Sequence, residues 1–333
     1  MTRPRPAPTF SALILLSLLA LALLASLLTG SVPVAPGDVL RAAWGGGDPT
    51  LVTIVRELRF PRALLSALVG GVLALSGAAL QALLQNPLAD PYLLGVSGGA
   101  ACGTLLGSLL GLSAAGVLGR VAMPLAGFLG ALVAVLLVGL GASVRGRLDR
   151  GRLLLSGVVV NALASAVLLF LLSWGDPSRT QSFVFWMLGS LAGATPEAVT
   201  TLAVYAALGL AILLPLAPAF DALSLGEETA FTLGVSVEAV KRTAYLGASL
   251  LAAAAVAVSG IIGFVGLLVP HAVRLLVRSH RALLLLSFIG GAILLVLADT
   301  AARTLFAPAE ISVGAVTALL GAPAFLLLMR RRG

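Results

Sequence analysis

The side chains that could carry catalysis or bind a metal are few in this sequence. Its 333 residues include one cysteine, Cys102, two histidines, His271 and His280, and a single lysine, Lys241. Two histidines and one thiol do not form a histidine-rich metal cluster, and no convincing pair of nucleophile and base is present. We therefore expect no enzymatic activity, no catalytic residue, no metal site and no cofactor.

The sequence also lacks a motif for binding ATP. A phosphate-binding loop needs a glycine pattern followed by Lys and then Ser or Thr, whereas Lys241 is followed by Arg242 and lacks those glycines. None of the 13 acidic residues lies at the centre of an apolar run, and Asp299 comes nearest, close to the end of one. Ion-coupled secondary transporters usually bury such groups in mid-membrane, so that class is a remote alternative. The sequence favours a passage powered by a separate motor.

The composition assigns the chain to the membrane. Hydrophobic residues make up 59% of it and charged residues 10%, against about 25% in soluble domains. The net charge of +8 is spread along a hydrophobic chain, which indicates membrane topology rather than nucleic-acid binding. We predict an all-α polytopic membrane protein that forms one domain over 1–333. At about 20 residues per span, the apolar runs give about ten transmembrane helices, at 11–30, 63–85, 92–112, 117–141, 152–174, 196–217, 241–261, 262–278, 282–303 and 311–329.

Basic residues give the orientation. Fourteen Lys and Arg residues lie on the side of the two termini and seven on the other side, so we predict that both termini are cytoplasmic. Four of the seven outer residues, Arg41, Arg56, Arg59 and Arg62, fall within 31–62. They either contact lipid headgroups or form a docking patch for an acidic partner.

Two connections are too long to be simple turns. Residues 175–195 on the outer side are rich in aromatic side chains and could form a short interfacial helix. On the inner side, within 218–240, Ser224 and Glu227 fit a capping box and Gly234 is placed to end the helix. A helix of about nine residues is too short to span the bilayer, and we expect it to provide a cytoplasmic contact surface.

The segment Asn86–Ala100 contains a tight inner turn. Pro87 ends the preceding span, and Asp90 acts as an N-cap with Pro91 at the first position of the next helix. This turn places Asn86 and Leu88 at the cytoplasmic mouth, where a gate would lie.

A second motif runs from Gly260 to His271. Its glycines at 260, 263 and 266 permit close helix contact, and Pro270 should kink or break the eighth span. His271 could be functional, but we interpret it as a structural hydrogen-bonding residue near the cytoplasmic end.

Taken in order, these segments resemble the FecCD-type permeases of ATP-binding-cassette importers, which carry iron chelates, haem or vitamin B12. The matching segments cover nearly the whole chain: Arg59–Arg62, Leu68–Gly71, Ser76-Gly77, Asn86–Ala100, Leu153–Gly157, Trp186–Ser190, Leu225–Glu227, Gly260–His271, Ala298–Arg303 and Gly314–Pro323.

The resemblance implies a vitamin B12 permease-like type II ABC importer fold. It implies a multi-pass subunit of the cell (inner or cytoplasmic) membrane that works as a homodimer, with two copies of an ABC ATPase and a periplasmic or lipid-anchored substrate-binding protein. The ATPase would dock on a coupling helix at 221–234, with Asp221, Ser224, Leu225, Gly226, Glu227 and Glu228 as contact residues. Arg59, Arg62 and Arg303 match the arginines that meet the binding protein. Glu228 and the charged turn Asp149-Arg150 depart from the family pattern.

The resemblance leaves the cargo open. We expect a ferric siderophore, because that is the commonest cargo of such permeases, with haem or cobalamin as alternatives in the same class. The expected mechanism is alternating access: closure of the ATPases moves the 221–234 segment and reshapes the mouth near Asn86 and Leu88.

Overall fold

The computed structural model describes all residues except 1–7, 31, 33, 113–115, 175–176 and 331–333. The described chain is almost entirely helical. Its α-helices are α1 (Pro8–Leu28), α2 (Pro36–Ala43), α3 (Pro49–Thr53), α4 (Phe60–Leu84), α5 (Val96–Leu109), α6 (Gly116–Ala142), α7 (Arg150–Trp174), α8 (Pro177–Met187), α9 (Pro196–Leu213), α10 (Ala217–Leu223), α11 (Glu227–Thr232), α12 (Val237–Ser259), α13 (Val265–Arg274), α14 (His280–Thr304) and α15 (Val313–Arg330). A π-helical turn (Ile54–Arg59) and 3₁₀ turns (Pro91–Leu94, Leu214–Leu216) join some of them, and β1 (Ser143–Val144) pairs antiparallel with β2 (Arg147–Leu148).

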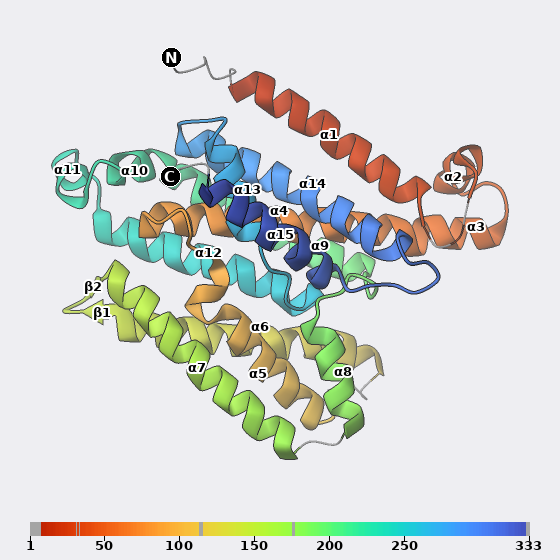
Figure 1. Cartoon of the computed structure of the whole chain (residues 1–333), viewed down its shortest axis with the longest axis horizontal. Coiled ribbons are helices and arrows are strands. Elements are labelled where there is room, and N and C mark those ends of the chain that lie inside the picture. The colour runs from red at the N-terminus through yellow and green to blue at the C-terminus, as the bar shows by residue number, and fades with distance from the viewer. Residues whose placement is uncertain (1–7, 31, 33, 113–115, 175–176, 331–333) are drawn as a thin grey trace.

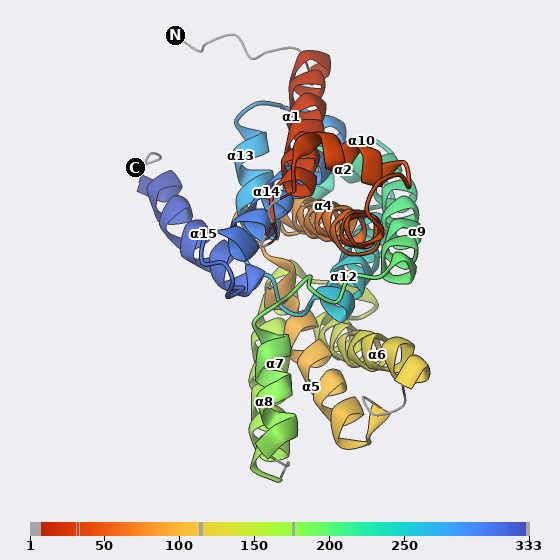
Figure 2. The ribbon, with the colours of Figure 1, turned by 90° about the vertical axis from the view of Figure 1, so that its right-hand side faces the viewer.

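The helix α4 forms the centre of the fold. It continues directly from the π-helical turn at Ile54–Arg59, carries Pro61 in its first turn, and ends at Gln85 in the left-handed conformation. Most of its residues are buried, and α1, α9, α12, α13 and α14 pack around it (Figure 2). Gly70 of α4 and Gly291 of α14 lie so close that a Cβ on either would meet the other's carbonyl oxygen. Small residues thus bring these two helices together, as in other membrane bundles.

The helices α5, α6, α7 and α8 form a second group beside the α4 bundle (Figures 1 and 2). Gly99 and Gly103 of α5 pack directly on the backbone of α6 at Gly130 and Ala126. Tyr245 of α12 joins the groups, because its hydroxyl donates a 2.6 Å hydrogen bond to the carbonyl of Val135 on α6.

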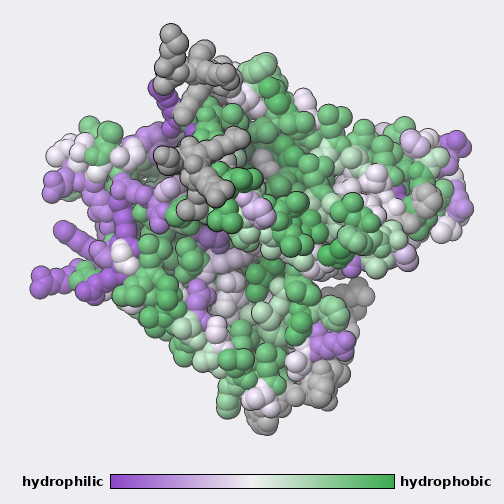
Figure 3. Space-filling model, in the orientation of Figure 1, coloured by the Kyte–Doolittle hydropathy of each residue, from purple (hydrophilic) through white to green (hydrophobic). Residues whose placement is uncertain are grey.

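The two ends of the bundle differ in polarity. The β1–β2 hairpin, α10 and α11 lie at one end, where α1 also begins and α15 ends (Figure 1). Hydrophilic residues gather over that end, while much of the body is hydrophobic (Figure 3). This is the end to which the excess of basic residues assigns the cytoplasm, and α2 and α3 lie at the opposite, outer end.

Within the described residues, a helix occupies each of the ten predicted span positions, but their lengths differ from the prediction. Seven are long and apolar enough to cross a membrane, whereas α5, α13 and the Val313–Leu327 part of α15 are shorter. The predicted spans 92–112 and 262–278 are wrong in extent, because part of each is a turn or extended chain rather than helix. A short helix, α8, is present within 175–195, as expected.

Candidate functional site

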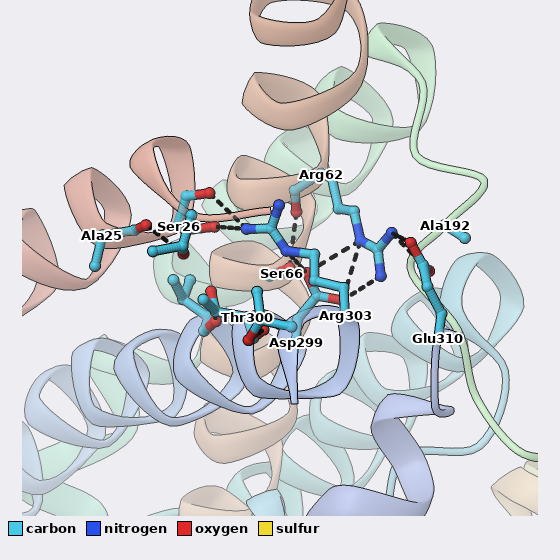
Figure 4. A network of polar contacts seen from close by, with 12 residues as sticks. Ala25, Ser26, Arg62, Ser66, Ala192, Asp299, Thr300, Arg303 and Glu310 are labelled. Carbon is cyan, nitrogen blue, oxygen red and sulfur yellow. Dashed lines mark hydrogen bonds and ion pairs between the residues drawn. The ribbon is translucent and has the colours of Figure 1, made fainter. Parts of the chain in front are cut away.

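An ion-pair network joins α4 to α14 at the outer end (Figure 4). Arg62 lies in the first turn of α4, and its guanidinium is 3.0 Å from the carboxylate of Asp299 on α14 and 3.0 Å from that of Glu310. Asp299 is buried, whereas the Glu310 side chain is 41% exposed. One arginine therefore connects a buried acid to an exposed one on the loop that leads into α15.

The other two arginines predicted to dock a partner hold the end of α1. Arg303, one helical turn beyond Asp299, donates to the carbonyl of Ser26 at 2.5 Å and to its hydroxyl at 2.7 Å. Arg59 donates to the carbonyls of Leu27, at 2.8 Å, and of Val32. Both side chains are buried, at 5% exposure or less. Their positive charges thus lie against carbonyl oxygens at the C-terminal end of α1, where a cation is favourable.

These three arginines meet around one small cavity. It has a volume of about 270 Å³, and its lining includes Arg59, Arg62, Arg303, Glu310 and Ala194. The structure thus brings together the residues that the sequence singled out. The sequence analysis did not identify Glu310 or Ser26 as members of this group, and the four-residue spacing of Asp299 and Arg303 was the only local signal of pairing.

At the cytoplasmic end, two carboxylates attach α10 and α11 to the membrane helices. Asp221 of α10 accepts hydrogen bonds from the His280 backbone N–H, at 3.0 Å, and contacts its ring Nδ1 at 2.6 Å. Glu227 of α11 lies 3.2 Å from Lys241 on α12 and 3.2 Å from Arg150 at the start of α7. Arg150 belongs to the charged turn that departs from the family pattern. In the structure its charge is paired with Glu227 of α11.

The predicted capping box is wrong. The Ser224 hydroxyl donates to the carbonyl of Asp221 at 2.6 Å, so this residue closes α10 instead of opening α11. The segment forms two short helices rather than one, because Gly226, with a φ of 113°, turns the chain between them. Gly234 does follow the end of α11 with a positive φ, as predicted.

This turn and α11 present an apolar surface to the cytoplasm. Leu225, Phe231 and Leu233 are 67%, 74% and 64% exposed, and Glu228 is exposed beside them. The helix α11 lies at the end of the molecule where hydrophilic residues dominate (Figures 1 and 3). We call Leu225, Phe231 and Leu233 the α11 patch.

The turn after α4 has the predicted form. The Asn86 side chain accepts a 2.9 Å hydrogen bond from the Leu88 N–H, and Leu88 is 41% exposed. Asp90 caps the 3₁₀ turn by accepting from the Tyr92 N–H at 2.8 Å, with Pro91 at the first position. Burial raises the pKa of Asp90 to about 6, although this hydrogen bond acts in the opposite direction. Pro87 follows the end of α4.

Of the kink or break predicted at Pro270, a break is absent. Pro270 is inside α13, whereas the chain is unwound at 260–264, before that helix begins. Of the three glycines in this motif, Gly266 packs against Gly77 of α4 and Gly260 against the carbonyl of Trp186, but no atom lies within 4 Å of a Cβ added at Gly263. His271 is buried and contacts Phe325 of α15 edge-on, consistent with a structural role.

Comparison with known proteins identifies the family. The chain is 43% identical over 288 residues to the cobalamin import system permease protein BtuC of Halobacterium salinarum, covering 86% of this chain and 76% of that one. It is 42% identical to the hemin transport system permease protein HmuU of Yersinia pestis, covering 83% of each. A solved metal-chelate type ABC transporter in an inward-facing conformation superposes with a TM-score of 0.85 at 32% identity, covering 97% of this chain and 99% of that one. The model of the FecCD transport family matches residues 18–331, and the chain belongs to that family of ABC importer permeases.

Proposed function

We propose that this permease imports a bulky metal chelate across the cytoplasmic membrane, as a homodimer driven by two copies of a separate ABC ATPase and supplied by a substrate-binding protein. The observation that carries the proposal is the α11 patch. Exposed apolar side chains on the most polar end of a membrane protein favour a protein partner there. Because the sequence has no nucleotide-binding motif, an ATPase fits this position.

The coupling segment is 221–234, with Asp221, Ser224, Leu225, Gly226, Glu227 and Glu228. Within it, the α11 patch would contact the ATPase. Asp221 and Glu227 would transmit the movement of the ATPase to α14, α12 and α7.

The double substitution of Leu225 and Phe231 by Asp should prevent co-purification of the ATPase. Leu305→Asp, a matched control at an equally exposed position of the outer end, should retain it. Stoichiometric ATPase on the double variant would contradict the assignment.

Arg59, Arg62 and Arg303 are proposed to receive acidic groups of the binding protein at the outer end. Arg62 is the reachable member, because its present partner Glu310 is exposed and a carboxylate from outside could replace it. Glu310→Gln should therefore strengthen docking of the binding protein, and Arg62→Gln should weaken it. The control is Arg41→Gln, since Arg41 is exposed on α2, away from the arginine cavity. Equal affinity in all three would exclude this site.

Asn86 and Leu88 are proposed to belong to the cytoplasmic gate. Their turn follows the cytoplasmic end of α4, and the neighbouring Gln85 donates to the carbonyl of Leu223 in α10. Movement of α10 would therefore reach the turn directly, which fits an alternating-access passage.

The cargo is proposed to be a ferric siderophore, which fits the metal-chelate type of the similar solved transporter. A second candidate class, a corrin or porphyrin chelate, is favoured by the relatives that are 43% and 42% identical. Uptake of labelled ferric siderophores, haem and cobalamin should be compared in cells with and without the gene. Loss of one cargo identifies the substrate. Uptake that instead collapses with the proton gradient at constant ATP would favour a secondary transporter.

A further inference from the structure

Of the two consecutive helices α12 and α13, only α12 is long enough to span the membrane. The helix α12 has 23 residues and α13 has 10, which correspond to about 35 Å and about 15 Å at 1.5 Å per residue. The hydrocarbon core is about 30 Å thick. Since α13 ends at Arg274 on the cytoplasmic side, residues 260–264 must complete the crossing as non-helical chain, and they extend to about the middle of the membrane.

Tyr92 is hydrogen-bonded to the non-helical segment 260–264, which we call the break. Its hydroxyl donates to the carbonyl of Ile262 at 2.8 Å and accepts from the N–H of the same residue at 3.1 Å. The Tyr92 carbonyl in turn accepts a 3.0 Å hydrogen bond from the Asn161 side chain on α7. One tyrosine thus satisfies both backbone groups of Ile262 and links the break to the short turn before α5.

Close contacts surround the break on the other sides. The Ser190 N–H donates to the carbonyl of Ser259 at 2.8 Å, which attaches the loop after α8. Phe264 has a φ of 68°, a conformation that is costly for a bulky residue, and its Cβ lies against Gly321 of α15. The surrounding helices therefore hold 260–264 in a defined, strained shape.

Gly263 is the exception in this packed surrounding. It is partly exposed, and an added Cβ would have open space around it. Within the described residues, neither its N–H nor its carbonyl has a hydrogen-bond partner. An unpaired backbone at membrane depth is tolerated where it meets water but not where it meets lipid.

We infer that the break at 260–264 lines the translocation path, with the backbone of Gly263 facing its water, and that Tyr92 is the positioning residue that holds the break in this shape. The inference deepens the proposed transport function, but its first test does not depend on which cargo is carried. Because Tyr92 also bonds to α7, a movement of α7 would reach the path wall through it.

Cysteine accessibility tests the lining. In the Cys102→Ser background, Gly263→Cys in the assembled complex should react with a charged, membrane-impermeant methanethiosulfonate at least tenfold faster than Val133→Cys. Val133 is the control because it is 56% exposed on the long helix α6, where it would face lipid. Equal, slow reaction at both positions would overturn the inference. Fast reaction at position 263 in a complex that imports none of the chelates would leave the lining intact and contradict the proposed cargo instead.

Two tyrosine variants test the positioning role. Tyr92→Phe removes the hydroxyl that bonds to Ile262, and it should change the reaction rate of Gly263→Cys at least threefold. Tyr245→Phe is the matched control, because it also removes a buried tyrosine hydroxyl bonded to a backbone carbonyl, but at a distance from the break. It should leave the rate unchanged even where it lowers thermal stability. The same rate in both variants would show that Tyr92 has only a structural role.

Discussion

The guanidinium of Arg62 is bonded to the carboxylate of Asp299 through both Nε, at 3.1 Å, and Nη2, at 3.0 Å, although 237 residues separate them in the chain. Asp299 is 1% exposed and also lies 3.6 Å from Arg303. One buried carboxylate therefore balances two arginines at the packed crossing of α4 and α14, and the three groups are energetically coupled.

Asp299→Asn should destabilise the protein by about 3–5 kcal/mol, because it removes the acidic partner of the buried Arg303 and leaves Arg62 with only the partly exposed Glu310. Thermal unfolding of the purified permease in detergent measures this. Glu310→Gln is the control: the partially exposed Arg62–Glu310 pair should contribute only about 0–1 kcal/mol. Similar losses in both variants would mean that the network is exposed and screened.

Glu227→Gln should loosen α11, because Glu227 is the acidic partner of both Lys241, which is 6% exposed, and Arg150. We expect hydrogen exchange of the backbone amides in 227–233 to accelerate at least tenfold, which corresponds to about 1.4 kcal/mol of lost local stability. Glu228→Gln, at the exposed neighbouring position, should leave exchange unchanged. Unaltered protection in the Glu227 variant would mean that packing alone holds α11.

Gly77→Ala should disrupt the crossing of α4 and α13. A Cβ at Gly77 would overlap the carbonyl oxygen of Gly266, and rigid backbone cannot move aside as a side chain would. Overpacking of this kind costs about 1–3 kcal/mol or more. Gly193→Ala is the control, since nothing lies within 4 Å of its Cβ. The yield of folded protein on size-exclusion chromatography should fall for the first variant only.

The helix positions could be predicted from the sequence, because long apolar runs specify membrane helices locally. The extents of the spans predicted at 92–112 and 262–278 could not be predicted correctly. Residues 262–278 read as one apolar run, but residues 262–264 are unwound, and Ile262 is hydrogen-bonded to Tyr92, which lies 170 residues earlier in the chain. A local sequence pattern cannot reveal a hydrogen-bond partner so far away in the chain.

The arginine group was predicted in part. Its members were identified by charge and family resemblance, which gave the correct end of the molecule. Their burial was not predicted, because it depends on contacts with Ser26, Leu27 and Asp299 that form only when α1, α4 and α14 pack together. Likewise, Ser224 fitted a capping box by spacing, but α10 extends to Leu223, so Ser224 follows the end of that helix.

The pH dependence of stability should report on Asp90. Burial raises its pKa to about 6 from an ordinary value of 3.8, so the folded state binds this proton more tightly than the unfolded state does. The resulting stabilisation is complete below about pH 4 and is lost as the pH rises through 6.

Asp90→Asn keeps an oxygen that can accept from the Tyr92 N–H but carries no charge. It therefore removes the cost of burying an ionised carboxylate at neutral pH. The difference in Tm between variant and wild type should therefore be positive at pH 7.5, by an amount equivalent to about 1 kcal/mol or more, and should shrink as the pH falls through 6, reaching zero only below about pH 4. Taking the difference at each pH cancels the titration of other groups. A difference that stays constant with pH would show that Asp90 is solvated and ionised throughout.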